Sequence, residues 1–476
     1  METINQILET ADSLVWGIPL IVIILFVGFL LTIRLGCLQV LNLHNALFYV
    51  LHSEKEGEGE VSSFGALCTA LAATIGTGNI VGVATAIGTG GPGALFWMEV
   101  AAFLGMATKY AEGVLAVKYR VVGNDGKVLG GPFYYIQNGI RERFGWNMKW
   151  LAVLFAVFGV CAGLFGIGTI TQVNGITSAV NMLVPSSEFA NVGGVSVSFT
   201  TAITGLVVTL CVAFVIIGGL RRIAKVASIV VPFMAIFYVL ICVFFLLLNF
   251  SHISEAVETV VRAAFNPSAV TGGAVGSMFI AMQKGIARGI FSNEAGLGSA
   301  PIAAAAAKTK EPVRQGLVCM TGTFFDTIII CTMTGLTIVI SGAWDPNLHL
   351  EGVGITMEAF SRGFSFLPVG SQIAPYFLAI SLAFFAFTTI LGWAYYSEKC
   401  LQFLIGKGRT QKLVFRWLYV AAVFIGPYLT VSAVWTSADI FNGLMAFPNL
   451  VALILLSGIV ARETRLFFGK FSNREL

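Results

Sequence analysis

The most regular feature of the chain is a series of long apolar runs separated by short polar segments. Each run is close to the length of about 20 residues that an α-helix needs to cross a bilayer. The pattern predicts about eleven spans, near residues 14–33, 64–87, 92–117, 150–172, 201–219, 226–249, 273–291, 317–341, 374–397, 413–431 and 435–460. We therefore expect an all-α polytopic membrane protein.

Composition supports this interpretation. Hydrophobic residues make up 57% of the 476 residues and charged residues only 11%, whereas soluble domains carry about 25% charged residues. Such a chain cannot cover a soluble globule with polar surface, so we expect it in a plasma or inner membrane, with the lipid bilayer as its partner. The net charge of +4 is small and the basic residues lie mainly in loops, so neither nucleic acid nor an obligatory protein partner is indicated.

The basic residues also predict the orientation. They concentrate in the segments 118–149, 221–225, 308–314 and 399–416 and after residue 461, whereas the alternate loops hold only Arg262 and Arg362. Loops rich in Lys and Arg face the cytoplasm, so we expect the N-terminus outside and the C-terminus inside. The acidic linker before the second span, with Glu54 and Glu60, fits this topology poorly, but acidic residues weigh little in the rule.

The order of the spans suggests an internal repeat. Once residues 1–63 are set aside as an N-terminal helix and cytoplasmic linker, ten spans form two sets of five, at 64–249 and 250–461, before a tail at 462–476. Because five is odd, the second set is inverted relative to the first. Glycines interrupt the opening helix of each set: Gly76, Gly78 and Gly82 in one, Gly272, Gly273, Gly276, Gly285 and Gly289 in the other. Paired interruptions of this kind indicate a transporter binding site; alternatively, glycine is simply common in membrane helices.

The glycine-rich stretch 76–79 is the strongest candidate for such a site. A membrane helix must satisfy its own backbone, so a break frees polar groups that need cover from protein or water. The amides of Thr77, Gly78 and Asn79 would begin an outer half-helix, which favours a carboxylate. The carbonyls near Ala72 and Ile75 would end the inner half and suit a hard cation. The spacing does not match the GxGxxG of dinucleotide-binding loops.

Two other spans carry polar residues at membrane depth. Phe279 and Gln283 share one helix face, where Gln283 would bind either substrate or a neighbouring helix. Thr388 and Thr389 could complete a cation shell, with Trp393 one turn beyond Thr389, although threonine often bonds to its own helix instead.

Several ionisable residues also lie within the spans, where they are functional suspects by default. Lys109 and Glu112 are spaced to form a structural pair. For Asp326 two roles remain open, an ion pair with Lys284 or Arg288 of the seventh span and a proton relay. Lys284 and Arg288 themselves are better explained by snorkelling or by an acidic partner than by substrate contact.

Catalytic and channel functions find little support. The chain has no GxSxG, HExxH or P-loop motif, and its eight cysteines lie mostly in apolar runs without metal-ligand spacing. We therefore expect no enzyme and no organic cofactor. A channel or a membrane-embedded sensor remains an alternative, but channels usually build their filters from symmetric oligomers, whereas this symmetry is internal.

Four stretches, 64–84, 90–98, 291–301 and 326–332, resemble the alanine/glycine:cation symporter family. The resemblance covers about residues 14–460 and implies a LeuT-like 5+5 inverted repeat plus one extra N-terminal helix. It implies import of a small neutral amino acid, alanine or glycine, with sodium by alternating access. Proton coupling and a preference for glutamine or D-alanine stay open as alternatives. One departure is Glu99, where the family usually has Trp; this carboxyl either reaches the interface or alters ion coupling.

The resemblance also implies the site residues. By motif, those for substrate are Thr77, Gly78, Asn79, Phe279, Gln283, Thr389 and Trp393. Those for the sodium ion are the carbonyls of Ala72 and Ile75 and the hydroxyls of Thr388 and Thr389.

Overall fold

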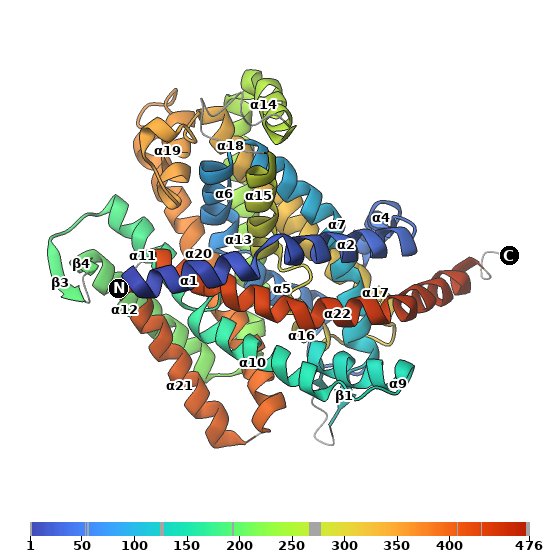
Figure 1. Ribbon diagram of the computed structural model, residues 1–476. Helices are drawn as coiled ribbons and strands as arrows, with labels where there is room; N and C mark the ends of the chain where they lie inside the picture. The colour runs from blue at the N-terminus through green and yellow to red at the C-terminus, as the bar shows by residue number, and fades with distance from the viewer. Residues whose placement is uncertain are drawn as a thin grey trace.

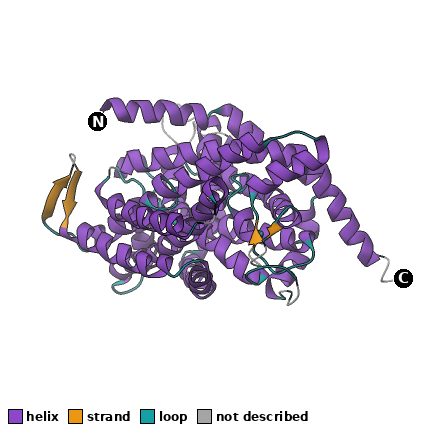
Figure 2. Ribbon diagram, turned by 90° about the horizontal axis from the view of Figure 1, so that it is seen from below, coloured by secondary structure: helices purple, strands orange, loops and turns teal. Residues whose placement is uncertain are grey.

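The computed structural model describes residues 2–52, 54, 57–123, 128–192, 195–265, 278–406, 408–429 and 431–472. The fold is a helical bundle (Figures 1 and 2). Two small antiparallel hairpins join β1 (Val121–Val122) to β2 (Val128–Leu129) and β3 (Glu188–Val192) to β4 (Val195–Ser198). The predicted helical class is confirmed.

The helices follow the chain in the order shown by the colours of Figure 1. Those of the first half are α1 (Glu2–Val15), α2 (Ile18–Arg34), α3 (Leu38–Leu41), α4 (Leu43–Leu51), α5 (Ser63–Thr74), α6 (Val83–Gly90), α7 (Gly93–Lys118), α8 (Pro132–Tyr134), α9 (Ile140–Phe144), α10 (Lys149–Phe165), α11 (Ile170–Leu183), α12 (Phe199–Ile217) and α13 (Leu220–Leu248). Those of the second half are α14 (Ile253–Phe265), α15 (Met278–Asn293), α16 (Ala300–Ala304), α17 (Pro312–Thr323), α18 (Thr332–Ser341), α19 (Val353–Gly363), α20 (Gly370–Ile405), α21 (Arg409–Ile425) and α22 (Val431–Ser472). Shorter helical turns of π or 3-10 type cover Gly78–Gly82, Tyr135–Gly139, Phe250–His252, Phe324–Cys331, Pro346–Leu348 and Gly426–Tyr428.

Within the described residues, seven helical segments are long and apolar enough to cross a membrane: Gly93–Lys118, Lys149–Leu183, Phe199–Ile217, Arg222–Leu248, Pro312–Ser341, Gly370–Ile405 and Trp435–Gly469. An eighth candidate is the bent pair Ser63–Thr74 and Gly78–Gly90. The structure thus confirms a protein with several membrane-spanning helices. The count of eleven and the inverted repeat stay predictions.

The first predicted span, 14–33, begins later than expected. Helix α1 ends at Val15, and α2 starts after Gly17, whose backbone is extended, with Pro19 in its first turn. Proline is favoured at that position because the first amides of a helix have no partner within it. The 17 residues of α2 span only about 26 Å at 1.5 Å per residue, slightly less than the bilayer core.

The seventh predicted span, 273–291, also differs. Its first part, with Gly272, Gly273 and Gly276, lies outside the described residues, and α15 runs without a break through Gly285 and Gly289. A Cβ atom at Gly285 would overlap the carbonyl of Ala94 on α7. These glycines therefore permit close packing of α15 against α7 and do not interrupt the helix.

The N-terminal helix α1 packs against α22 (Figure 1) and carries Asp12 next to charged groups of both α22 and α15. Burial, and then the nearby Asp439, raise the pKa of Asp12 to about 6, while Arg288 and Lys284 act in the opposite direction. One oxygen of Asp12 is buried without a hydrogen-bond partner among the described residues. Deprotonation is therefore unfavourable in the folded state.

This environment predicts that Asp12→Asn stabilises the protein near neutral pH. Because the folded state retains the Asp12 proton up to about pH 6, above the ordinary value of 3.8, wild-type stability falls as pH rises through this window. Thermal unfolding in detergent at pH 4 and pH 7.5 should show a higher Tm for Asp12→Asn only at pH 7.5. The exposed Glu255→Gln on α14 serves as control, and an equal effect of Asp12→Asn at both pH values would refute the prediction.

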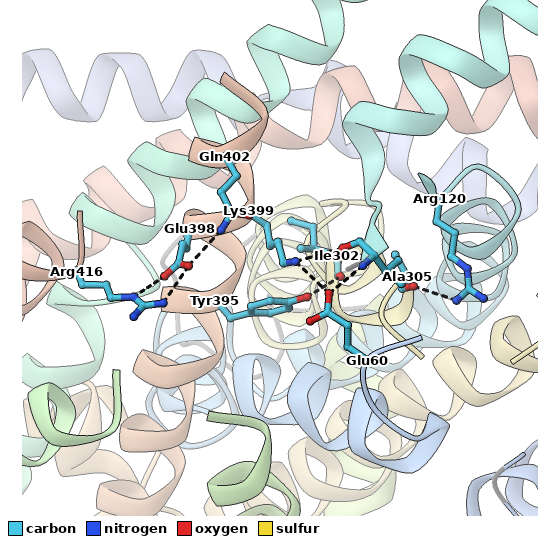
Figure 3. A network of polar contacts seen from close by, with 10 residues as sticks. Glu60, Arg120, Ile302, Ala305, Tyr395, Glu398, Lys399, Gln402 and Arg416 are labelled. Atoms are coloured by element: carbon cyan, nitrogen blue, oxygen red, sulfur yellow. Dashed lines mark hydrogen bonds and ion pairs between the residues drawn. The ribbon is translucent and has the colours of Figure 1, made fainter. Parts of the chain in front are cut away.

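At one end of the bundle, the acidic linker meets the basic loops (Figure 3). The Nζ atom of Lys399 lies 3.6 Å from Glu60 Oε1 and donates to the carbonyl of Val128 at 3.3 Å. Arg416 donates to both carboxylate oxygens of Glu398, at 2.8 and 3.1 Å. Two basic residues of the predicted segment 399–416, which the structure places on α20 and α21, thus lie at one end. The acidic linker that fitted the topology poorly supplies part of their counter-charge through Glu60.

Arg120 fastens the same end through backbone carbonyls. Its guanidinium donates to the carbonyls of Glu58, Ala305, Ala307 and Thr309, at 2.6 to 3.1 Å. Backbone hydrogen bonds add a short parallel bridge between Val61 and Ala307. The chain just before α5 is therefore held against the chain just after α16.

Candidate functional site

The predicted break in the second span is present in the structure. Helix α5 ends at Thr74, Ile75 adopts an extended conformation (φ −74°, ψ 95°), and a π-helical turn starts at Gly78. The two halves bend by 51°. The sequence prediction of an interrupted helix at residues 76–79 is confirmed.

Protein groups occupy most of the backbone amides at the break. The Gly76 amide donates to Asn79 Oδ1 at 2.9 Å, and the Asn79 amide donates to the Gly76 carbonyl at 3.3 Å. The Thr77 amide donates to Oε1 of Gln172 on α11 at 3.1 Å. In this state, the backbone amides of Thr77 and Asn79 are therefore not free. The acceptor for the Thr77 amide is Gln172, which the sequence analysis did not identify.

The Asn79 side chain connects the break to a buried carboxylate. Its Nδ2 atom donates to Asp326 Oδ1 at 2.8 Å and to the Asp326 carbonyl at 3.0 Å. The other carboxylate oxygen of Asp326 accepts from Ser292 at 2.8 Å and from Thr327 at 2.7 Å. Hydroxyl and amide donors surround this carboxylate, and Arg288 pairs with Asp439 instead. The ion-pair alternative for Asp326 is therefore wrong, and the proton-relay alternative stays untested.

A second interruption follows α15. The helix ends at Asn293, and Glu294, Gly296 and Gly298 adopt positive φ angles of 57°, 85° and 81° before α16 begins. Gly296 and Gly298 have the same spacing as Gly76 and Gly78. That pair of glycines was the signal that could have located this break in the sequence.

The two interruptions lie against each other. A Cβ atom at Gly78 would lie 3.0 Å from Cα of Ser292. At the second break, the Glu294 carboxylate accepts from Trp393 Nε1 at 2.7 Å and from the hydroxyl of Ser299. Trp393, fully buried on α20, is thus fixed to the second break through its indole nitrogen.

The two threonines of α20 point to different neighbours. Thr389 Oγ1 donates to the carbonyl of Ile75 at 3.1 Å, as well as to Phe385 of its own helix. Thr388 Oγ1 bonds to carbonyls of its own helix and lies 3.4 Å from the sulfur of Met234 on α13. Ala72 is fully buried on α5. Thr389 alone of this pair contacts the break through a hydrogen bond among the described residues.

Phe279 and Gln283 lie away from the break. Phe279 is 38% exposed, and Gln283 Nε2 donates to the carbonyl of Trp16 at 3.4 Å. Ser292, which touches the break, lies nine residues after Gln283, or about 14 Å along the helix. The structure therefore does not bring these two predicted residues together with residues 76–79.

The remaining ionisable residues of the spans have other neighbours than expected. Glu112 accepts from Nδ2 of Asn449 at 2.7 Å, and Lys109, although buried, forms no ion pair with a described residue. Lys109 and Glu112 still attract each other electrostatically without a contact at ion-pair distance, so their structural pairing stays a prediction. Glu99 is partly buried, and its Oε1 atom has no hydrogen-bond partner among the described residues.

A cavity of about 750 Å³ lies beside α6, the second half of the broken helix. Its walls come from α6, α11, α15, the segment 346–353 and Trp435. Helix α5 starts next to the Glu60 end of the bundle, and α6 continues away from it to this cavity. The structure is therefore closed by ion pairs and carbonyl contacts at the basic end and hollow at the opposite end.

Comparison with known proteins identifies the family. The model of the sodium:alanine symporter family matches residues 1–475. The chain is 47% identical to a sodium/alanine symporter of Methanococcus maripaludis over 97% of each chain. It is 36% identical to a putative sodium/proton-dependent alanine carrier protein of Bacillus subtilis, over 94% of this chain and 89% of the relative. It is also 36% identical to a probable sodium/glutamine symporter of that organism, over 96% and 90%.

These matches extend over nearly the entire chain, so the helices, the break and the polar residues around it are all covered. The protein is accordingly a membrane transporter of the amino-acid/cation symporter type and not an enzyme. The chain belongs to the sodium:alanine symporter family.

Proposed function

We propose that the protein imports a small neutral amino acid, alanine or glycine, together with sodium by alternating access. The observation that carries the proposal is the interrupted helix at residues 76–79. There the backbone amide of Thr77 donates to Gln172 Oε1, and the hydroxyl of Thr389 donates to the carbonyl of Ile75. An amide position suited to a carboxylate thus lies next to an oxygen pair suited to a cation. Relatives described as a sodium/alanine symporter and an alanine carrier support this choice of substrate.

The substrate carboxylate would take the place of Gln172 Oε1 at the Thr77 amide and extend to Gly78 and Asn79. The positive end of the following helix favours this negative charge. A carboxylate accepts stronger hydrogen bonds than a neutral amide oxygen, so the exchange is favourable. Phe279 and Gln283 join the proposed site in an occluded state in which the N-terminal part of α15 tilts towards residues 77–79, because Ser292 at its other end already touches the break.

Sodium would bind where Thr389 now donates to the Ile75 carbonyl. The ion would replace this hydrogen bond, because both the hydroxyl oxygen and the carbonyl oxygen would coordinate it. Hard cations prefer oxygen ligands of this kind. The Ala72 carbonyl and the Thr388 hydroxyl complete the proposed shell, the latter after leaving its own helix. The bound ion would then join α5 to α20 and fix the break in its substrate-binding shape.

The coupling is energetically sufficient. One sodium ion crossing a potential of 100 mV provides about 2.3 kcal/mol, and a tenfold sodium gradient provides about 1.4 kcal/mol more. The sum supports an accumulation of a few hundred-fold for one-to-one coupling. With the N-terminus outside and the C-terminus in the cytoplasm, the cavity beside α6 would open outward and the ion-paired end would close the cytoplasmic side.

The second candidate is a symporter of the same family that prefers glutamine or D-alanine or that uses protons. Relatives described as a sodium/glutamine symporter and a sodium/proton-dependent carrier favour keeping it. This candidate differs from the first in the side chain of the transported amino acid or in the coupling ion. The structure of the break is the same for both.

Uptake into proteoliposomes tests both candidates. Radiolabelled alanine should accumulate against its gradient with sodium outside, and not with lithium or choline, at pH 6 and pH 8 alike. Unlabelled glycine should compete well and glutamine poorly. Equal uptake in choline at low pH would favour proton coupling, strong competition by glutamine would favour the second substrate, and flux without accumulation would indicate a channel.

Truncating Trp393 is expected to widen substrate selectivity. Its indole lies one turn from Thr389 and is fully buried, so Trp393→Ala leaves a large apolar space near the proposed substrate side chain, at a stability cost of about 3–5 kcal/mol. Competition of labelled alanine uptake by valine and leucine should increase relative to wild type. Trp393→Phe keeps most of the volume but loses the donor to Glu294; if it broadens selectivity equally, the hydrogen bond and not the volume sets the limit.

A further inference from the structure

Arg288 stands in the wall of the cavity with only part of its hydrogen-bonding capacity used. Its side chain is 14% exposed and forms a two-pronged ion pair with Asp439, at 3.0 Å from Nη1 to Oδ1 and 2.6 Å from Nη2 to Oδ2. A guanidinium has five N–H donors. The ion pair engages two nitrogens and leaves donors available for another acceptor.

Two aromatic rings flank the guanidinium. Its carbon lies 5.1 Å from the centre of the Trp435 ring and 5.5 Å from that of Phe291. Trp435 lines the same cavity. Aromatic faces and Asp439 together hold the cation in place, so its position beside the cavity is built into the structure.

Arg288 also carries the only permanent positive charge among the described residues that line the cavity. The other ionisable residues there are His349 and Glu351, both in the segment 346–353. Because Asp439 and Glu351 offset this charge overall, the guanidinium provides a local binding point for one carboxylate group of a zwitterion rather than a field that concentrates anions.

The cavity leads from Arg288 towards the break. The rings of Phe291 and Trp435 pack at 5.1 Å between centroids, and a Cβ atom at Gly78 would lie 3.4 Å from Phe291. On the other wall, Gly175 lines the cavity and lies against the side chain of Thr77. The aromatic pair therefore stands between the cavity and the amides of the break.

We propose that Arg288 is a substrate-docking residue of the cavity: its guanidinium binds the carboxylate of the incoming amino acid before that carboxylate reaches the amides at residues 76–79. Asp439 is the positioning residue that keeps the guanidinium beside the cavity. This inference rests on the proposed function, because it takes the transported amino acid as the ligand. It adds an initial binding position in the cavity, separate from the proposed substrate site at residues 76–79.

The test compares three variants in proteoliposomes with labelled alanine. Arg288→Gln removes the charge and should raise the KM for alanine about tenfold, the equivalent of one charged hydrogen bond, while Vmax and the sodium concentration for half-maximal uptake stay within about twofold. Arg288→Lys keeps the charge and should restore most of the affinity. Asp439→Asn removes the charge partner but keeps the cation and an Oδ1 acceptor that still positions it, and should change KM by less than about threefold.

Ionic strength supplies a second readout that a purely structural role would not move. Added choline chloride screens the approach of the carboxylate, so the KM of wild type should rise with salt and that of Arg288→Gln should not. Equal damage by Arg288→Gln and Asp439→Asn, or an unchanged KM in Arg288→Gln, overturns the inference. If wild type itself shows no sodium-dependent accumulation of alanine, the proposed function fails first, and the two failures are thus distinguished.

Discussion

Replacing Asn79 with alanine is expected to abolish sodium-driven uptake of alanine, to below about one hundredth of the wild-type rate. The side-chain oxygen of Asn79 accepts from the backbone amide of Gly76, and its side-chain nitrogen donates to the backbone carbonyl and to Oδ1 of Asp326. Removing it leaves a buried amide and a buried carboxylate oxygen without these partners, and each unsatisfied group costs about 1–3 kcal/mol or more. The break can then no longer hold its shape.

The matched control for this experiment is Asn442→Ala. Asn442 is fully buried on α22, and its side-chain amide has no hydrogen-bond partner among the described residues. Its replacement removes the same chemical group from an equally buried position without touching the break, so uptake should persist. Both variants are first compared by size-exclusion chromatography to confirm folding. Normal uptake by Asn79→Ala would show that residues 76–79 do not form the substrate site.

Thr389→Val is expected to raise the sodium concentration for half-maximal uptake about tenfold or more. Valine has nearly the shape of threonine but lacks the hydroxyl that contacts the Ile75 carbonyl. The proposed sodium ion would lose one ligand worth more than about 1.4 kcal/mol, which corresponds to a factor of ten. The measurement is the sodium dependence of labelled alanine uptake at saturating alanine.

Thr388→Val is the internal comparison, because the adjacent hydroxyl bonds to its own helix and lies near Met234. Its sodium dependence should shift less than that of Thr389→Val. If both variants keep the wild-type sodium dependence, sodium does not bind between α5 and α20. If Thr388→Val alone shifts it, the ion lies on the α13 side of α20.

Local sequence signals predicted the parts of the fold that depend on neighbouring residues. The glycines of residues 76–79 lie inside an otherwise apolar run, and the structure breaks the helix there. Two glycines, one within α15 and one just after it, show the limit of that signal. Gly285 allows close packing against a neighbouring helix, and Gly296 allows a turn with a positive φ angle. The tertiary structure around each glycine decides between these roles, and the local sequence does not.

The partners of the break were beyond sequence reasoning for a related reason. Gln172 lies 95 residues from Thr77, and Asp326 lies 247 residues from Asn79. No spacing rule joins positions so far apart, and a buried carboxylate among apolar residues gives no sign of which donors it will meet. The family resemblance covered Asp326 in the stretch 326–332 without linking it to the break, and it did not name Gln172.

The placement of Asp326 has a consequence for leakage. One of its carboxylate oxygens holds Asn79 at the first interruption and the other holds Ser292 at the second. A displacement of either interruption thus pulls on the same side chain. Neither interruption can rearrange alone without breaking a buried hydrogen bond. This disfavours slippage, in which an ion crosses the membrane without the substrate.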